Sequence, residues 1–187
     1  MIYIIRHGQT ELNNRQVLQG RSDHPLNEVG ARQAEKAAEK LQAVSFDTVY
    51  TSPLIRAIQT ARIIAPDLDP VIDDRLIEMD YGPYEGMDLH DSAPEVLTFF
   101  RDFVHNPAPE GMEQLDSVVD RAGAFLRDRC ITDSNILIST HAIAMKGILE
   151  YLTPDSRDRY WSKNIGNCAV YTTKLLPDGT WSVPVEL

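Results

Sequence analysis

Short apolar runs and helical patterns alternate along the chain, and this order predicts the fold. Residues 2–5 form a continuous run of strand-forming side chains, which is typical of a strand buried on both faces of a sheet. Residues 46–51 and 135–139 have the same character. Apolar residues recur at helical spacing elsewhere, so we expect an α/β three-layer sandwich in which helices flank a mostly parallel central sheet. The expected helices are residues 27–41, the segment that begins at Ser52-Pro53, and residues 94–104, 113–129 and 142–152.

Three further segments complete the predicted layout. Val71-Ile72 has the pattern of a short edge strand. Residues 168–175 and 180–185 alternate like paired strands around a turn at residues 177–179, which predicts a C-terminal antiparallel hairpin at one sheet edge. We expect a single domain over residues 1–187, with residues 79–112 forming a small helical and loop cap.

Composition and charge restrict the classes of partner. The formal net charge of −10, without any run of Lys or Arg, argues against a nucleic-acid partner. Cys130 and Cys168 provide neither a disulfide framework nor the spacing of a zinc site. No apolar run approaches the roughly 20 residues that span a bilayer, and the first strand begins without the basic region of a signal peptide. We therefore expect a soluble cytoplasmic protein without a membrane partner; a homodimer remains open.

Charged side chains lie where the predicted strands end. Arg6 and His7 end the first strand, Arg56 follows the second, and His141 follows the strand before the last helix. Ligands of open α/β sheets bind at the carboxyl ends of the strands, so these four side chains are expected in one crevice. Arginine forks match phosphate oxygens, and imidazole can attack or transfer protons near neutral pH. The combination predicts phosphoryl transfer through a histidine nucleophile.

A leaving alkoxide also needs a proton. Glu78 opens a loop that is expected to lie over the pocket, which makes it the carboxylic acid best placed by sequence to supply that proton. Metal binding is less favoured, because no two His or carboxylate residues have the spacing typical of metal ligands.

Each of these residues also has a structural explanation when it is taken alone. A lone histidine is more often hydrogen-bonded within a fold than catalytic, and this interpretation is kept for His24, His90 and His105. Arg56 lies off the apolar stripe of its helix and would by itself be a surface arginine, although its charge opposes the helix dipole. The convergence of several such groups on one edge favours the functional interpretation.

The same residues resemble the signatures of the histidine phosphatase superfamily, in its phosphoglycerate-mutase-like branch. Residues 6–10 resemble the Arg-His-Gly-x-Thr signature, and residues 52–61 closely match the second signature of the family. The other matching positions are Asn13, Gly20, Asp23, Pro25, Leu26, Gly30, Gln33, Glu78, Gly82, Glu85, Gly86 and His141.

The resemblance implies a role for each matching residue. His7 would become phosphorylated, Glu78 would donate the proton, and Gly8 would let its loop turn close to the anion. The implied enzyme is a phosphatase without a metal or an organic cofactor. The residues expected to contact the phosphoryl group are Arg6, Asn13, Gln19, Gly20, Arg56 and His141.

The chain departs from the family pattern at Leu12, at Ala142 and at Met112-Glu113-Gln114. These departures fall on substrate-facing or supporting positions, so they bear on the substrate more than on the reaction. The short chain favours hydrolysis of a small phosphorylated metabolite. The alternatives are a 2,3-bisphosphoglycerate-dependent phosphoglycerate mutase and a catalytically weak phosphate-binding scaffold of the same fold.

Overall fold

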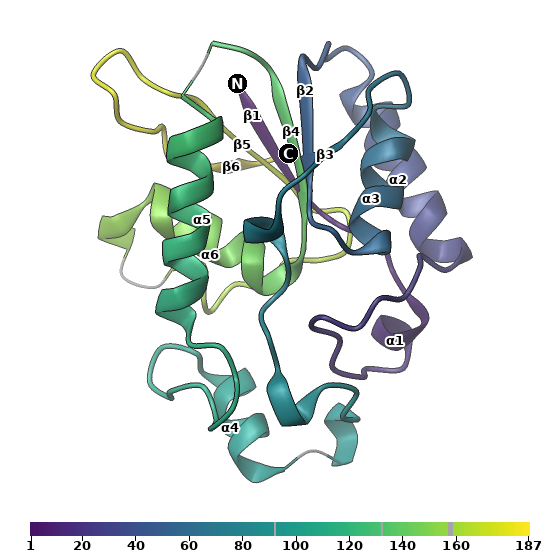
Figure 1. Cartoon of the computed structure of the whole chain (residues 1–187), viewed down its shortest axis with the longest axis vertical. Coiled ribbons are helices and arrows are strands. Elements are labelled where there is room, and N and C mark those ends of the chain that lie inside the picture. The colour runs from purple at the N-terminus through teal and green to yellow at the C-terminus, as the bar shows by residue number, and fades with distance from the viewer. Residues whose placement is uncertain (92, 132, 157–158) are drawn as a thin grey trace.

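The computed structural model describes residues 1–91, 93–131, 133–156 and 159–187. Within these residues the chain forms a six-stranded sheet with the order β3-β2-β4-β1-β5-β6 (Figure 1). Strands β1 to β4 are parallel, whereas β5 runs antiparallel to β1 and β6 runs antiparallel to β5. The predicted α/β fold with a mostly parallel sheet is therefore confirmed. The strands are β1 (Ile2–Arg6), β2 (Thr48–Thr51), β3 (Val71–Ile72), β4 (Ile136–Thr140), β5 (Val170–Thr173) and β6 (Val185–Glu186).

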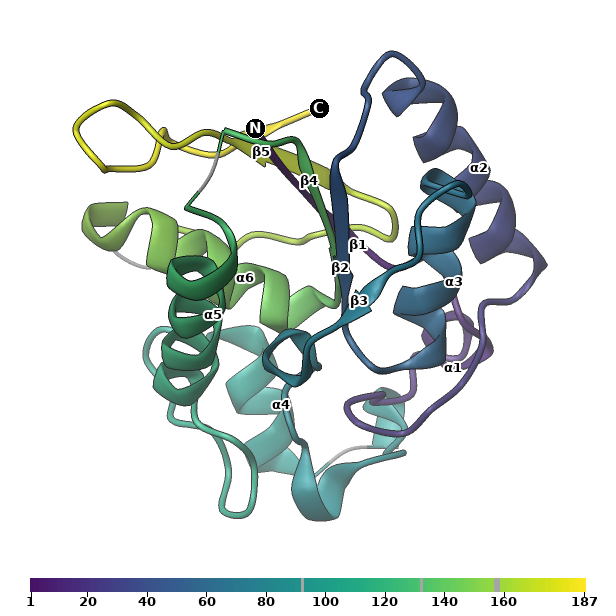
Figure 2. The same cartoon turned by 45° about the horizontal axis from the view of Figure 1, so that its top comes forward.

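Helices cover both faces of the sheet, with α2 and α3 on one face and α5 and α6 on the other (Figure 2). Strand side chains alternate between these layers: Ile4 and Ile138 belong to the apolar cluster with α5 and α6, and Ile5 and Leu137 to the cluster with α2 and α3. Because β1 and β4 are buried on both faces, their sequences are continuously apolar. The helices are α1 (Glu11–Asn14), α2 (Glu28–Leu41), α3 (Ile55–Ile64), α4 (Pro94–Arg101), α5 (Leu115–Arg129) and α6 (Ala142–Leu152), with short 3-10 turns at Asp74–Leu76, Gly82–Tyr84, Leu89–Asp91 and Pro154–Ser156.

The predicted helix start at Ser52-Pro53 is wrong. Helix α3 begins at Ile55, and the N-cap residue Leu54 makes no side-chain capping bond. The Ile55 N–H instead donates to the Asp23 carboxylate at 2.7 Å, so a loop distant in sequence supplies the acceptor that a local cap would provide. This arrangement leaves the Ser52 hydroxyl available to the site described below.

The predicted helix over residues 94–104 is also shorter in the structure. Helix α4 ends at Arg101, because the Asp102 carboxylate accepts the N–H groups of both Val104 and His105 at 3.1 Å and folds the chain into a turn. Helix α4 and its neighbouring segments lie beyond the carboxyl ends of the parallel strands, at the bottom of Figure 1. This is the segment expected to form a cap, of which residue 92 lies outside the described residues.

The C-terminal hairpin exists, with a shorter second strand than predicted. Strand β6 pairs antiparallel with Tyr171 and Thr172, and a single bridge between Leu175 and Trp181 lies nearer the turn. Pro184, just before β6, has no N–H to donate to a ladder, which explains why residues 180–184 do not continue the strand.

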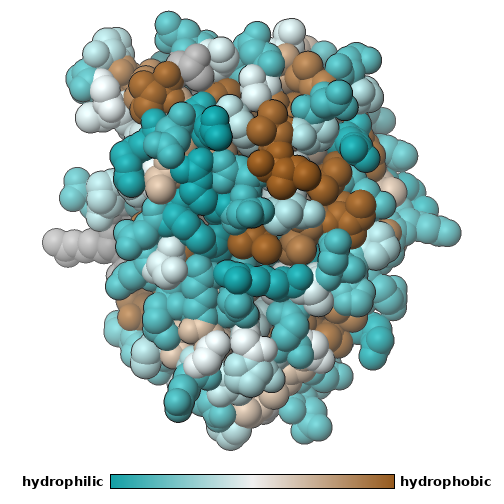
Figure 3. All heavy atoms as spheres, in the orientation of Figure 1, coloured by the Kyte–Doolittle hydropathy of each residue, from teal (hydrophilic) through white to brown (hydrophobic). Residues whose placement is uncertain are grey.

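The other sheet edge is formed by β3, as the sequence predicts. Val71 and Ile72 are largely exposed there, and Figure 3 shows apolar side chains gathered on the face over this strand. Among the helices of the described residues, none combines the length and the apolar character needed to cross a membrane.

A close backbone crossing anchors the loop after β1 to helix α2. A Cβ atom at Gly8 would overlap the carbonyl of Gly30, and one at Gly30 would overlap the backbone of Gln9. The Gln9 N–H also donates to Gln33 on the same helix at 2.9 Å. Gly8 was expected to permit close approach to an anion; the approach that the structure shows is to helix α2.

We predict that Gly30→Ala destabilises the protein by about 1–3 kcal/mol, because the added methyl group forces the Gln9 backbone away. The higher helix propensity of alanine would by itself stabilise α2, so the predicted destabilisation comes entirely from the steric overlap. Gly166→Ala is the matched control, since a Cβ there meets no atom within 4 Å. Urea unfolding measures both. Equal or higher stability of Gly30→Ala would show that the crossing is not tight.

Candidate active site

Strand register sets the two predicted catalytic histidines side by side. Arg6 of β1 pairs with Thr140 of β4, and each strand is followed at once by a histidine. The His7 N–H donates to the Thr140 carbonyl at 2.9 Å. The rings of His7 and His141 lie with their centroids 5.1 Å apart, so the predicted convergence of these strand ends occurs.

His7 is buried, and its ring is oriented by a backbone carbonyl. Its Nδ1 lies 2.6 Å from the Gly8 oxygen, and a carbonyl oxygen can only accept a hydrogen bond. Nδ1 therefore carries the proton, which leaves a lone pair on Nε2. Burial lowers the pKa of His7 well below its usual range, and the positive charges of Arg56 and Arg6 lower it further. The neutral imidazole that a nucleophile requires is thus the favoured form.

Arg56 is fully buried, which excludes the alternative that it is a surface arginine. Its Nη2 and Nη1 groups donate to the carbonyls of Gly20 at 2.6 Å and Ser22 at 2.8 Å. Its Nε–H donates to His141 Nδ1 at 3.2 Å, so the proton of neutral His141 lies on Nε2 and donates to the Ser52 hydroxyl at 2.7 Å. Burial, followed by the charge of Arg56, lowers the pKa of His141 well below its usual range.

Glu78 is a buried carboxylate held at the N-terminus of α6. Its Oε1 accepts the N–H groups of Met79 and Ala144 at 2.9 Å, and its Oε2 accepts the N–H of Ile143 at 3.2 Å. These three donors fix the orientation of the carboxyl group, and the helix dipole favours negative charge at this position. The positive charges of Arg6 and Arg56 lie within its electrostatic range.

Glu85 fixes the loop that holds Arg56. Its carboxylate accepts the N–H groups of Gly20 at 2.9 Å, Arg21 at 3.3 Å and Ser22 at 3.2 Å, together with the Ser22 hydroxyl at 2.5 Å. The opposite sides of Gly20 and Ser22 present their carbonyls to Arg56. The loop at residues 20–22 therefore lies between Glu85, which accepts its N–H groups, and Arg56, which donates to its carbonyls.

Two buried donors near His7 have no partner among the described residues. They are Arg6 Nε and Gln19 Nε2. The Nη1 group of Arg6 donates to the Ile165 carbonyl at 2.5 Å, and the Thr10 hydroxyl donates to Gln19 Oε1 at 2.6 Å, so both side chains are held in place. Buried donors without acceptors are costly, and an anion in the neighbouring cavity would supply the missing acceptors.

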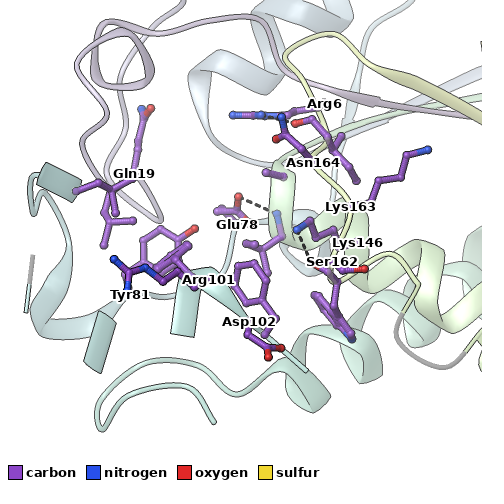
Figure 4. A pocket seen from close by; sticks show the side chains of 18 of the residues that line it. Arg6, Gln19, Glu78, Tyr81, Arg101, Asp102, Lys146, Ser162, Lys163 and Asn164 are labelled. Carbon is purple, nitrogen blue, oxygen red and sulfur yellow. Dashed lines mark hydrogen bonds between the residues drawn. The ribbon is translucent and has the colours of Figure 1, made fainter. Parts of the chain in front are cut away.

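A cavity of about 840 Å³ opens beside His7, and part of its lining is drawn in Figure 4. Among the predicted site residues, Arg6, His7, Asn13, Gln19 and Glu78 line it. Gly20, Arg56 and His141 do not line the cavity, and the last two contact each other behind it. The structure therefore separates the predicted set into a lining group and a supporting group.

The cavity has more positive than negative groups, in contrast to the acidic chain. Its described lining contains five Arg or Lys side chains and two carboxylates. The charge of −10 belongs to the chain as a whole and does not describe this cavity. No group of three or more His, Cys, Asp or Glu residues in the described ranges is arranged to hold a metal ion.

Several supporting residues were not predicted as site residues. Thr60 accepts the Gly8 N–H at 3.1 Å, Asn167 donates to the His7 carbonyl at 3.0 Å, and Arg121 donates to the Ile77 carbonyl just before Glu78 at 2.6 Å. Thr60 lies within the second signature, so its position was a usable signal. Asn167 and Arg121 belong to a loop and a helix whose sequence patterns do not distinguish them.

The departures from the family pattern have different locations. Ala142 lines the cavity as the first residue of α6. Leu12 and residues 112–114 do not line it. Met112 is buried in the apolar cluster that includes α4, and Glu113 accepts a hydrogen bond from the Arg121 guanidinium at 2.8 Å.

His105, which was interpreted as structural, lines the cavity and is paired with Asp102 at 2.8 Å.

The fold and the cavity define an α/β protein with a cationic site at the carboxyl ends of parallel strands. Residues 2–185 match the histidine phosphatase superfamily (branch 1), and the chain belongs to this superfamily. The resemblance recognised in the sequence is thereby confirmed.

Individual proteins show the same likeness over nearly the whole chain. Phosphoserine phosphatase 1 of Hydrogenobacter thermophilus is 29% identical over 90% of this chain and 83% of its own length. Phosphoglycerate mutase-like protein 4 of Arabidopsis thaliana is 30% identical over 98% of this chain and 83% of its own. A crystal structure of a phosphoserine phosphatase variant from Entamoeba histolytica in complex with phosphoserine is 25% identical, with a TM-score of 0.84, and covers 99% of this chain and 93% of its own.

The buried histidines predict acid sensitivity of the fold. A histidine whose pKa is lowered on folding binds its proton more readily in the unfolded chain, whose histidine pKa is about 6.5. The stability is complete above that pH and falls as the pH decreases below it, by up to roughly 1.4 kcal/mol per pH unit for each histidine. Urea unfolding between about pH 5 and pH 7 measures this slope.

His141→Gln should reduce the slope, whereas the same change at the exposed residue His24 should leave it unaltered. A wild-type stability that stays constant from pH 7 to about pH 5 would contradict the neutral buried pair.

Proposed function

We propose that this chain is a phosphomonoesterase that hydrolyses a small phosphorylated metabolite through a phosphohistidine on His7. One observation carries the proposal: the Gly8 carbonyl fixes the His7 proton on Nδ1 and leaves Nε2 as a nucleophile in a cavity-lining residue. The unpartnered donors of Arg6 and Gln19 support it, because both side chains line the same cavity as His7 and have hydrogen-bonding capacity that a phosphoryl group could use.

The first step transfers the phosphoryl group to the enzyme. Glu78 enters this step as the carboxylic acid. His7 Nε2 attacks phosphorus, the bond from phosphorus to the substrate oxygen breaks, and Glu78 gives its proton to that oxygen. The alcohol leaves with this proton. Three backbone N–H donors stabilise the Glu78 carboxylate that results.

The second step restores the enzyme. A water oxygen attacks the phosphorus of the phosphohistidine, its proton passes to the Glu78 carboxylate, and the bond from phosphorus to Nε2 breaks as phosphate is released. The proton stays on Nδ1 throughout both steps and donates to the Gly8 carbonyl, so the imidazole keeps one orientation. Neither step requires a metal or an organic cofactor, and we propose a metal-independent cytoplasmic enzyme.

The remaining predicted residues divide between direct and indirect roles in this proposal. Arg6, Asn13 and Gln19 would hold the phosphoryl oxygens from the cavity wall. Arg56 and His141 lie outside the cavity lining but next to His7, where the charge of Arg56 and the neutral imidazole of His141 would stabilise the transferred group. Gly20 contributes by holding Arg56 through its carbonyl.

A phosphoglycerate mutase is the second candidate, and the likeness to a mutase-like plant protein favours keeping it. Such an enzyme returns the phosphoryl group from His7 to a sugar acid rather than to water. Isomerisation of 3-phosphoglycerate that depends on added 2,3-bisphosphoglycerate would identify it. A scaffold that only binds phosphate would show neither this reaction nor hydrolysis.

We predict that wild-type protein hydrolyses a generic aryl phosphate in the presence of EDTA, and that His7→Ala abolishes the acid-labile phosphoenzyme. His105→Ala is the matched control, because His105 lines the same cavity but is exposed and paired with Asp102. Rapid quenching with labelled substrate measures the trapped intermediate. Wild-type levels of label on His7→Ala would exclude this nucleophile, and an inactive wild-type protein would refute the phosphatase proposal.

For Glu78→Gln we predict a loss of roughly 10²- to 10⁴-fold in kcat/KM with alkyl phosphates, whose leaving groups need a proton. The loss should be much smaller with aryl phosphates, whose oxygens leave as stable anions. A series of leaving groups in steady-state assays measures this dependence, and Glu110→Gln, at an exposed glutamate, serves as the control. The same loss with every leaving group would argue against a proton donor.

A further inference from the structure

Lys146 is a buried cation in the cavity wall that the proposed chemistry does not use. It lies on α6, one turn after Ala142, and only 7% of the residue is exposed. Arg6, Glu78 and Glu150 lie within its electrostatic range. Figure 4 shows Lys146 on one side of the cavity near Glu78 and Ser162, with Gln19 and Tyr81 across from it. The lysine is therefore near the reacting groups without contacting His7.

The ammonium group of Lys146 is incompletely satisfied. One of its three N–H groups donates to the Trp161 carbonyl at 2.8 Å, and the nitrogen lies 4.6 Å from the centre of the Phe103 ring. No carboxylate of the described residues is within ion-pair distance of it. Burial lowers the pKa of Lys146 to about 8, although Glu78 opposes this effect. A methionine would fill the same space at a lower desolvation cost, so packing does not account for the charge.

The segment that carries Trp161, the hydrogen-bond partner of Lys146, is also held in place. Glu150, one turn further along α6, accepts the N–H groups of Tyr160 at 2.6 Å and Trp161 at 3.2 Å. The segment that provides the carbonyl partner of Lys146 is therefore fixed to the helix that carries the lysine. A cation held in this way keeps its two remaining N–H donors in a constant position in the cavity wall.

Three other cations that line the cavity differ from Lys146: Lys163, Arg101 and Arg159. Lys163 is paired with Glu186 at 2.7 Å and lies over the Tyr171 ring, and its side chain extends away from Lys146 in Figure 4. Arg101 and Arg159 are exposed. Among the described residues that line the cavity, Lys146 is thus a buried cation that forms no ion pair.

We propose that Lys146 binds a carboxylate of the substrate, so that the preferred substrate is a phosphomonoester that carries a carboxylate away from its phosphate. This inference rests on the proposed function and specifies its substrate class. The cavity of about 840 Å³ has room for both ends of such a molecule. A single ammonium next to Phe103 and Trp161 matches one negative charge, whereas a second phosphate would require the guanidinium forks found beside His7.

Matched pairs of substrates test this assignment. O-phosphoserine and O-phosphoethanolamine differ by one carboxylate, and 3-phosphoglycerate differs from glycerol 3-phosphate by a carboxylate in place of a hydroxymethyl group. We expect wild-type kcat/KM to be at least about tenfold higher for the carboxylated member of a pair. In Lys146→Met this preference should disappear through a higher KM, with kcat almost unchanged. Lys163→Met is the matched control and should keep the preference, because its ammonium is already paired.

Binding measurements separate this inference from the proposed function. Calorimetry with His7→Ala protein, with and without Lys146→Met, gives the affinity for each member of a pair without turnover. A carboxylate preference that Lys146→Met removes supports the assignment even if the wild-type protein hydrolyses nothing. Equal affinity of the His7→Ala protein for both members of each pair overturns it, even if hydrolysis is rapid.

Two further outcomes also overturn the assignment. An equal loss of kcat with both members of a pair would mean that Lys146 acts through Glu78 rather than on the substrate. A preference that persists in a folded Lys146→Met protein would place the carboxylate elsewhere. Thermal unfolding of the variant verifies that the cap segment still packs against α6.

Discussion

The parallel pairing of β1 with β4 is the constraint on which the site depends. Because Arg6 lies opposite Thr140, the residue after each strand is a histidine at the same height on the sheet edge. A register slip would move these side chains relative to one another and exchange the two buried faces of β1. The apolar clusters on both sides of the sheet therefore fix the strand register, and with the hydrogen bonds of each ring they hold the two imidazoles 5.1 Å apart.

Burial of two histidines and two arginines together is electrostatically unfavourable. Backbone carbonyls offset part of this cost by accepting hydrogen bonds from the arginines. The carbonyls of Gly20 and Ser22 accept from Arg56, and that of Ile165 accepts from Arg6. The histidines remain neutral because burial and the neighbouring guanidiniums both disfavour a further charge. A dianionic phosphoryl group would complete this arrangement, since it supplies negative charge and acceptors for the unpartnered donors of Arg6 and Gln19.

The sequence was sufficient to predict the layers, the strand ends and the lining residues Arg6, His7 and Glu78, because each depends on local pattern or on a signature. It was insufficient for contacts that join distant segments. Ser52 has the pattern of a helix cap, yet Asp23 provides the acceptor for α3 and Ser52 binds His141. The sequence predicts Arg56 at the site, but helical periodicity cannot show that a loop 34 residues earlier covers it and accepts its hydrogen bonds. The end of α4 depends on the side chain of Asp102, which competes with the helix for backbone donors.

Backbone atoms also determine the orientation of the proposed catalytic groups. The Gly8 carbonyl selects the His7 tautomer, and the N–H groups of Ile143 and Ala144 direct Glu78. Such contacts tolerate many side chains at the positions that provide them, so the chemistry can be retained while the cavity wall changes. Specificity is then free to reside one helical turn away, where Lys146 and Ala142 share a face of α6. The same helix thus orients the proposed proton donor with its first N–H groups and presents to the cavity the side chain proposed to select the substrate.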